Sequence, residues 1–332
     1  MTNLSYTADV ARDTASVYAL LKDQYTADHW ETLAPYIAEI NRLKHEKNAV
    51  ILAHNYMTPD IFHGIADIVG DSLALAREAA KTTGDIIVQC GVHFMAETSK
   101  VLCMDKKVLL PDLKAGCSLA ESITANDVRL LRERYPGVPI VTYVNTSAEV
   151  KAESDVCCTS GNAVKIVNAL DADEVLMIPD QYLAQYVQTK TKKKIHYWAG
   201  SCMVHERFTA NDITRFRAQY PGVQVLAHPE CPPEVLTASD YTGSTQQMIE
   251  HLETHKPAKV VLITECSMSD NVAATTPSTE FVRSCQLCPH MKRITLPKIL
   301  ECLRHETPEI LVDPAIAVRA RVAVERMLEL SK

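Results

Sequence analysis

The sequence has no run of about 18 consecutive apolar residues, which is the length that a membrane-spanning helix requires. Its first 30 residues lack the apolar core of a secretory signal peptide. It also lacks the GxGxxG pattern of dinucleotide-binding folds and the Walker A pattern of nucleoside triphosphatases. We therefore expect a cytoplasmic protein that does not span a membrane and does not use either nucleotide-binding motif.

Basic charge is scarce as well. The 34 Lys and Arg residues are outnumbered by 41 Asp and Glu residues, which gives a net charge of −7. The single basic run, at 190–194, is typical of a solvated helix end or turn. Because there is no stripe of Lys and Arg, we expect no nucleic-acid partner.

Cysteine, by contrast, is plentiful. The chain has eleven cysteines, and in a protein without an export signal thiols serve metal sites or catalysis more often than disulfides. The composition, 47% apolar and 23% charged, is ordinary for a globular protein. A length of 332 residues is too great for one hydrophobic core, so several domains are expected.

One segment of the sequence is repeated. ITANDVRLLRERYPGVPIV occupies 123–141, and FTANDITRFRAQYPGVQVL occupies 208–226. A weaker third copy, ITLPKILECL, occupies 294–303. A repeat of this period predicts three similar structural units.

The repeat also aligns three cysteines. Cys117, Cys202 and Cys288 each precede the Thr of their copy by seven residues. None of the other eight cysteines has a cysteine at the equivalent position of another copy. Equivalent positions of a threefold repeat can lie around one pseudo-axis, so the three thiols are expected to converge.

Short runs of apolar and β-branched residues alternate with amphipathic stretches of helical length. This alternation predicts buried parallel strands in βαβ units, and therefore an α/β fold. The nine predicted strands are 49–54, 85–90, 107–111, 139–144, 174–178, 194–198, 223–228, 259–264 and 280–284.

Helix and domain boundaries follow from the same repeat. Thr124 with Asp127, and Thr209 with Asp212, have the pattern of a capping box, and Tyr-Pro-Gly ends each of these helices. The predicted domains are an N-terminal helical extension (1–45), three repeat domains (46–123, 124–208 and 209–294) and C-terminal helices that close the fold (295–332).

Each repeat also contains an Asp, a turn of small residues and a hydroxyl residue before a helix. Five residues after Asp67, Asp155 and Asp240 come Ser72, Ser160 and Thr245. The free N–H groups of a helix N-terminus suit an anion. Plain N-capping explains one such residue, whereas three copies favour a ligand with several negative groups.

Three converging thiolates would hold a metal centre with one position free of protein. Zinc is one candidate, and a [4Fe–4S] cluster with an open iron, which acts as a Lewis acid, is the favoured one. A competing zinc site would combine Cys202 and His205 with Cys285 and Cys288. Alternatively, Cys285 and Cys288 form a redox pair.

A set of longer motifs covers nearly the whole chain. They are LAHNYMTPDI, ADIVGDSLALAREA, CGVHFMAETSKVL, LLPDLKAGCSLAES, VTYVNTSAEVKAESDVCCTSGNAVKIV, PDQYLA, CMVHERFT, LAHPECPPEV, GSTQQMI and CPHMKRITL. Together these motifs closely resemble the quinolinate synthase family.

The resemblance implies a transferase of de novo NAD synthesis that condenses iminoaspartate with dihydroxyacetone phosphate to quinolinate, releasing phosphate and water. It implies three αβα (Rossmann-like) domains around a pseudo-threefold axis, with a [4Fe–4S] cluster on Cys117, Cys202 and Cys288. Some members have a CxxCxxC run that ends on the third ligand. Here Val282 takes its first position, so a switch between the two non-ligand cysteines is not available. A transient partner, L-aspartate oxidase or aspartate dehydrogenase, would supply iminoaspartate.

The resemblance also implies roles at the substrate. Glu230 is the implied general base, and Tyr56, His54 and Tyr143 complete the catalytic set. The implied substrate-binding residues are His54, Ser72, Tyr143, Asn145, Ser160, His228, Glu230, Ser244 and Thr245. The alternative function is an iron–sulfur sensor that binds a dicarboxylate without turnover. A sensor needs anion contacts but no Glu and Tyr at the open iron.

Overall fold

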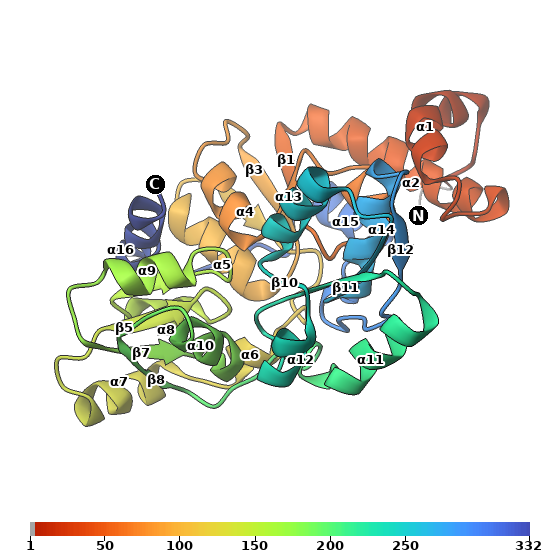
Figure 1. The fold of residues 1–332 in the computed structure, drawn as a ribbon. Helices are drawn as coiled ribbons and strands as arrows, with labels where there is room; N and C mark the ends of the chain where they lie inside the picture. The colour runs from red at the N-terminus through yellow and green to blue at the C-terminus, as the bar shows by residue number, and fades with distance from the viewer. Residues whose placement is uncertain (1–3) are drawn as a thin grey trace.

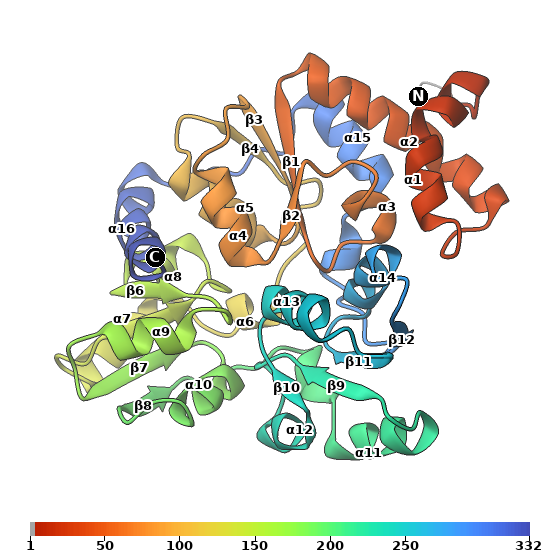
Figure 2. The same ribbon diagram turned by 45° about the horizontal axis from the view of Figure 1, so that its top comes forward.

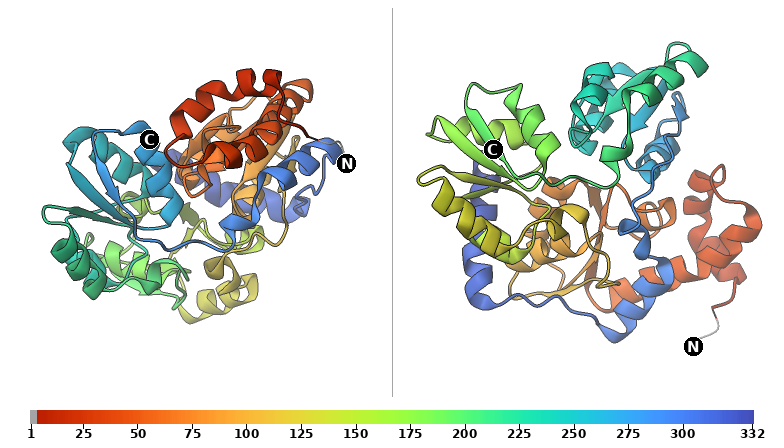
Figure 3. Two further views of the ribbon diagram at one scale, coloured as in Figure 1. Left: turned by 90° about the vertical axis from the view of Figure 1, so that its right-hand side faces the viewer. Right: turned by 90° about the horizontal axis from the view of Figure 1, so that it is seen from below.

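The structure, a computed structural model, describes residues 4–332 and has three parallel β-sheets with helices on their faces (Figure 1). Figure 2 shows the sheets as three lobes grouped around a common centre, and Figure 3 shows the N- and C-terminal helices on the outside of this group. In chain order, the sheets of lobes one, two and three span 49–109, 140–197 and 224–282. The predicted α/β fold of three Rossmann-like units is therefore confirmed.

Every sheet has four parallel strands in the same order, with the second strand at one edge, then the first, the third and the fourth. The strands are β1 (Ala49–His54), β2 (Ile68–Gly70), β3 (Ile86–Cys90) and β4 (Lys107–Leu109) in lobe one; β5 (Ile140–Tyr143), β6 (Val156–Cys158), β7 (Glu174–Ile178) and β8 (Lys194–Tyr197) in lobe two; and β9 (Gln224–Ala227), β10 (Tyr241–Thr242), β11 (Lys259–Ile263) and β12 (Glu280–Val282) in lobe three.

One strand in each lobe differs from the sequence-based expectation. β2, β6 and β10 lie where the sequence indicates only a turn of small residues, so that prediction is wrong for these residues. Each has only two or three residues and lies at an edge of its sheet. A segment this short has no period of apolar residues from which a strand could be predicted.

A repeated aspartate joins each of these edge strands to its neighbour. The Oδ2 atom of the aspartate accepts a backbone N–H from the first strand of the same lobe. The pairs are Asp67 with Ile51 at 2.8 Å, Asp155 with Ile140 at 2.7 Å and Asp240 with Val225 at 2.8 Å. The three aspartates therefore have the same structural role, because each fixes the chain just before it forms the edge strand.

Helices connect the strands and cover the sheets. In lobe one they are α3 (Pro59–Phe62), α4 (Ser72–Ala79), α5 (His93–Leu102) and α6 (Ser118–Glu121); in lobe two α7 (Ala125–Arg134), α8 (Ala148–Ala152), α9 (Ala163–Ala169) and α10 (Gln181–Gln188); and in lobe three α11 (Ala210–Gln219), α12 (Pro233–Ala238), α13 (Thr245–His255) and α14 (Cys266–Thr275). Short 3-10 helices at His205–Arg207 and Met291–Arg293 follow the last strands of lobes two and three.

The third copy of the repeat does not begin a fourth lobe. Helices α7 and α11, from the first two copies, begin lobes two and three, whereas α15 (Leu296–His305) packs on α2 (Ala27–Glu46) at lobe one. Its buried face, which includes Leu296 and Leu300, joins the same apolar core as β1 and β3. Each repeat helix thus covers the next lobe around the centre, and the third one returns to the first lobe.

Both ends of the described chain are helical. Helix α1 (Ala8–Leu21) packs on α2, and α16 (Pro314–Leu330) packs on α5 and α8, so that it links lobes one and two. Pro314 is the first residue of α16, where a missing N–H costs no helical hydrogen bond. Over residues 4–332, none of the helices has the length and apolar character needed to cross a membrane.

The capping boxes of α7 and α11 are expected to stabilise the protein. The hydroxyl oxygens of Thr124 and Thr209 accept the N–H groups of Asp127 and Asp212, whereas Thr295 makes no such bond at α15. We expect Thr124→Ala and Thr209→Ala each to lower the free energy of unfolding by about 0.5–2 kcal/mol, and Thr295→Ala to lower it by less. Urea unfolding measures the difference, and equal losses in the three variants would contradict it.

Candidate functional site

A cavity lies where the three lobes meet. Side chains from all three lobes line it, and every site residue predicted from the sequence except Ser244 is among them. The lining includes His54, Tyr56, Ser72, Cys117, Tyr143, Asn145, Ser160, Cys202, His228, Glu230, Thr245 and Cys288. The fold therefore gathers at one place residues that are spread over more than 230 positions of the chain.

The carboxyl ends of the central strands supply the polar side chains of this cavity. His54 is the last residue of β1, Tyr143 is the last residue of β5, and His228 directly follows β9. Parallel sheets of this kind bind ligands at the carboxyl ends of their strands. The three lobes direct these ends toward one another.

The three repeat cysteines share one local geometry. Each begins a helical turn in which its carbonyl oxygen accepts the N–H of the fourth residue on. The pairs are Cys117 with Glu121 at 3.0 Å, Cys202 with Glu206 at 3.0 Å and Cys288 with Lys292 at 3.1 Å. Each turn follows the last strand of a different lobe, so the three sulfur atoms reach the cavity from three directions.

The chemistry of the three thiols fits a bound cation. Burial raises the pKa of each thiol, that of Cys117 to about 12; in addition, Cys288 raises the pKa of Cys117, and Cys117 raises that of Cys202. Backbone N–H groups two and three residues further on act in the opposite direction and favour each thiolate. Three neighbouring thiolates are unfavourable alone, and a metal centre that replaces their protons would compensate their charge.

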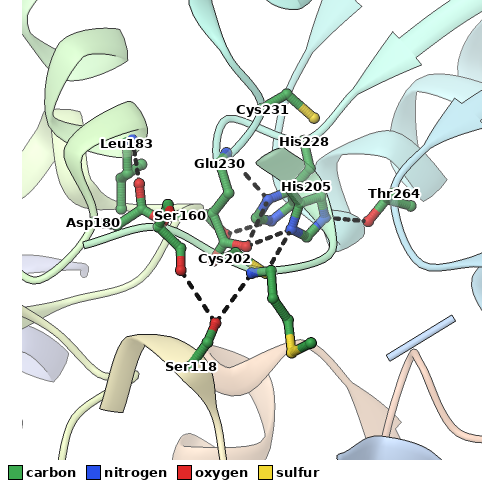
Figure 4. Close-up of polar contacts among 12 residues, drawn as sticks. Ser118, Ser160, Asp180, Leu183, Cys202, His205, His228, Glu230, Cys231 and Thr264 are labelled. Carbon is green, nitrogen blue, oxygen red and sulfur yellow. Dashed lines mark hydrogen bonds and ion pairs between the residues drawn. The ribbon is translucent and has the colours of Figure 1, made fainter. Parts of the chain in front are cut away.

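A buried carboxylate and two imidazoles lie beside Cys202 (Figure 4). Glu230 Oε2 is 2.6 Å from His205 Nδ1 and 3.7 Å from His228 Nδ1, and the two imidazole rings stack with centroids 4.6 Å apart. Burial alone would raise the pKa of Glu230, but the two histidines and a hydrogen bond from Tyr143 lower it to about 2. Glu230 is therefore a carboxylate at neutral pH.

Two histidines and two tyrosines in the cavity wall are held neutral. Burial lowers the pKa of His54 to about 4 and that of His228 to about 3, so neither imidazole carries a charge at neutral pH. Burial raises the pKa of Tyr56 and of Tyr143 well above the ordinary value, so both phenols keep their protons. The wall thus offers phenol and imidazole hydrogen bonds around the Glu230 carboxylate, which is ionised.

The three repeated hydroxyl residues are not helix caps. The N-cap residues are Asp71 for α4, Asn162 for α9 and Ser244 for α13, so the plain-capping explanation of Ser72, Ser160 and Thr245 is wrong. Ser72 and Thr245 are the first residues of their helices, whereas Ser160 lies before the cap of α9, so its expected place at the helix start needs correction.

The hydroxyls of two of these residues instead contact a residue of another lobe. Thr245 Oγ1 accepts a hydrogen bond from Asn55 Nδ2 at 2.8 Å, and Ser160 Oγ lies 3.2 Å from His228 Nε2. Ser244, which does not line the cavity, has its hydroxyl 3.5 Å from Asp71 and accepts the N–H of Gln247 as a cap.

Asp71 is a cavity residue that the sequence does not single out. Its Oδ1 accepts the N–H groups of Leu73 and Ala74, so two donors of the α4 N-terminus are already occupied. Burial raises the pKa of Asp71, which makes its carboxylate easier to protonate beside an anion. The first helix start is therefore a weaker anion site than Ser72 alone suggests.

Three further polar residues at the site are absent from the catalytic and substrate-binding residues predicted from the sequence. His205 Nε2 lies 2.9 Å from Thr264 Oγ1, which in turn lies 2.6 Å from the Tyr56 hydroxyl. Glu265, the N-cap residue of α14, lines the cavity and forms an ion pair of 2.9 Å with Lys292. His205 had a signal in the sequence through its CxxH spacing, whereas Thr264 and Glu265 had none.

The zinc site proposed from Cys202, His205, Cys285 and Cys288 is not assembled. Cys285 is exposed, has a φ of 55°, and does not belong to the cavity lining. Cys202 and Cys288 line the cavity together with Cys117 instead.

Comparisons with known proteins agree with these observations. A family model described as Quinolinate synthetase A protein matches residues 38–329. A quinolinate synthase of Sinorhizobium fredii is 59% identical over 330 residues, which cover 99% of this chain and 92% of that protein. A quinolinate synthase of Caulobacter vibrioides is 59% identical over 98% of this chain and 90% of its own length. One of Xylella fastidiosa is 62% identical over 88% of this chain and 86% of its own length.

Proposed function

Because the chain belongs to the quinolinate synthetase A family, we propose that it is itself a quinolinate synthase. In this proposal it condenses iminoaspartate with dihydroxyacetone phosphate to quinolinate and releases phosphate and water. The observation that carries the proposal is the single cavity that holds three repeat cysteines, one ionised carboxylate and two protonated phenols. Iminoaspartate would come from L-aspartate oxidase or aspartate dehydrogenase, and the free thiols favour a reducing, cytoplasmic setting.

Cys117, Cys202 and Cys288 would hold the [4Fe–4S] cluster. Support comes from their equivalent turns, their position on one cavity and the N–H groups that favour their thiolates. When bound, such a cluster supplies one iron without a protein ligand, which can act as a Lewis acid toward a substrate oxygen.

Glu230 would be the general base of the condensation. Its pKa is low because His205 and His228 lie within hydrogen-bonding or ion-pair distance of the carboxylate. A substrate C–H or N–H group that takes the place of His205 at Oε2 removes part of this lowering and makes the carboxylate a stronger base. The proton is then accepted at a position already shielded from solvent, since the Glu230 side chain is about 4% exposed.

Tyr56, Tyr143 and His54 would position and protonate substrate oxygens. Both phenols keep their protons, and the neutral imidazole has one N–H donor and one nitrogen acceptor. The substrates are anions, yet within the described residues no Lys or Arg lines the cavity. Recognition of carboxylate and phosphate groups would therefore rely on hydroxyls, Asn145 and helix N-termini rather than on ion pairs.

The hydroxyls of Ser72, Ser160 and Thr245 are expected to contribute to substrate affinity. We expect Ser72→Ala, Ser160→Ala and Thr245→Ala each to weaken substrate binding by about 0.5–2 kcal/mol, because each removes a donor near a helix start. Calorimetric titration measures the change, and the cluster spectrum should not alter. Thr209→Ala serves as the matched control, since it removes a helix cap away from the cavity. Loss of stability without loss of affinity in the cavity variants would refute their role in binding.

The proposed activity can be tested directly. Protein purified without oxygen would be given dihydroxyacetone phosphate and iminoaspartate, the latter made in the same vessel by L-aspartate oxidase. Quinolinate should form in a quantity that exceeds the amount of enzyme. Tight binding of both substrates by cluster-containing protein without product would refute a synthase and support the dicarboxylate sensor instead.

A further inference from the structure

Three metal-ligating side chains from two segments of the chain meet at one side of the cavity. Sγ of Cys202, a ring nitrogen of His205 and a carboxylate oxygen of Glu230 all lie within 4.8 Å of one another. His205 Nδ1 is 3.2 Å from Cys202 Sγ and 2.6 Å from Glu230 Oε2. Figure 4 shows these three side chains converging. This group contains only one of the three repeat cysteines.

The distances between the three ligand atoms would suit a single zinc ion after a small movement of the side chains. Tetrahedral zinc, with bonds of about 2.0 Å to N and O and 2.3 Å to S, separates its N and O ligands by about 3.3 Å and N from S by about 3.6 Å. The observed distances, 3.2 Å between N and S and 2.6 Å between N and O, are shorter by about 0.4 Å and about 0.7 Å, because hydrogen bonds now join these atoms. An ion that replaces those protons would push the ligands apart by that amount.

His205 is oriented for this purpose. Its Nε2 lies 2.9 Å from the Thr264 hydroxyl, so the outer nitrogen has a partner and Nδ1 faces the sulfur and the carboxylate. A hydrogen bond on the outer nitrogen fixes the ring and tautomer of ligating histidines. The His205 and Glu230 side chains are 1% and 4% exposed, so the ligands are preorganised in a dry wall.

The total charge of the three ligands and the free fourth coordination position also suit a divalent cation. A thiolate, a carboxylate and a neutral imidazole together balance a divalent cation. The fourth position would face the cavity, which leaves room for water, as in zinc sites with three protein ligands.

We propose that the cluster-free protein binds one Zn²⁺ ion through Cys202, His205 and Glu230, and that this ion blocks assembly of the cluster. The second statement rests on the proposed function, because it takes Cys202 to be a cluster ligand as well. Zinc at this place would also occupy the carboxylate proposed as the general base. A zinc-loaded chain would therefore be inactive for two separate reasons.

The experiment uses the full chain after the cluster has been removed by anaerobic chelation. Zn²⁺ is titrated against a chromophoric chelator, and Co²⁺ is used as a spectroscopic probe of thiolate ligation. We expect Cys202→Ala, His205→Ala and Glu230→Gln each to weaken Zn²⁺ binding by more than about 100-fold. Thr264→Val should weaken it by about 10–100-fold, the range for a residue that orients a ligand.

Cys117→Ala and Cys288→Ala are the matched controls, since each removes a thiol of the same cavity. They should leave Zn²⁺ affinity and the Co²⁺–thiolate band unchanged. Equal weakening by Cys117→Ala, Cys202→Ala and Cys288→Ala would overturn the proposal and place zinc on three thiols. Unchanged affinity in His205→Ala and Thr264→Val would overturn it too.

Cluster assembly gives the second measurement. One equivalent of Zn²⁺ should prevent reconstitution of the unsubstituted protein but not of His205→Ala, and equal uptake by both would refute the block. These measurements need no substrate. A chain that makes no quinolinate but shows this pattern would refute the proposed function and keep the zinc site.

Discussion

Replacement of any one of Cys117, Cys202 and Cys288 by alanine is expected to abolish the visible absorption of the purified protein. Unsubstituted protein isolated without oxygen should contain about four irons and four sulfides per chain, as a [4Fe–4S] cluster requires. The three thiols reach one cavity from three lobes through turns with the same backbone hydrogen bond, so each would hold a different iron. Loss of one ligand leaves two, which is too few to retain the cluster during purification.

Cys285→Ala is the matched control for this prediction. Cys285 lies three residues before Cys288 but is exposed and outside the cavity lining, so its replacement should leave iron, sulfide and absorption unchanged. Metal and sulfide analysis of the anaerobically isolated protein decides the outcome. Stoichiometric zinc without sulfide in that preparation would refute the cluster, whereas zinc uptake after cluster removal would not.

Glu230→Gln is expected to lower the turnover number by about 10²–10⁴-fold, the range that general acid–base catalysis contributes. Glutamine keeps the size of the side chain and can accept hydrogen bonds from His205 and Tyr143, but it cannot accept a proton. Substrate affinity and cluster absorption should therefore remain close to those of the unsubstituted protein. Anaerobic quinolinate formation, with binding measured separately, tests the change.

Glu234→Gln provides the control for a carboxylate outside the cavity. Glu234 is exposed on α12 in the same lobe, so its replacement should leave turnover unchanged. Normal turnover in Glu230→Gln would show that the base lies elsewhere, and Tyr56 or His54 would then be the next candidates. Loss of the cluster in Glu230→Gln would show that the carboxylate supports the metal centre instead.

The sequence predicted the features that depend on neighbouring residues or that recur in all three repeats. Alternating apolar runs gave the long strands because buried parallel strands need apolar residues on both faces. Thr124 and Thr209 predicted their capping boxes, since the groups that pair are only three residues apart. The shared register of Cys117, Cys202 and Cys288 predicted that the three thiols occupy equivalent places.

Features with no periodic signal could not be predicted in this way. The edge strands β2, β6 and β10 are too short to show a pattern, and sheet pairing with an existing strand forms them. The caps of α4 and α13 are Asp71 and Ser244, each one residue before the hydroxyl that the repeat aligns. A prediction that is wrong by one residue therefore exchanges the cap with the residue that follows it, because only the residue at the N-cap position can accept the first free N–H groups of a helix.

The arrangement of the lobes was decided by tertiary structure alone. His205 and Glu230 are 25 positions apart and come from different lobes, yet their side chains approach to 2.6 Å because α11 and β9 return the chain to the cavity. Helix α15 covers lobe one rather than a new lobe because its apolar face matches the core beside α2. Sequence patterns encode which face of an element is buried, whereas the partner of that face depends on how all the elements pack together. The sequence thus determined the repeated unit and its three cysteines, and the packing of three units determined which acid, base and metal ligands share one cavity.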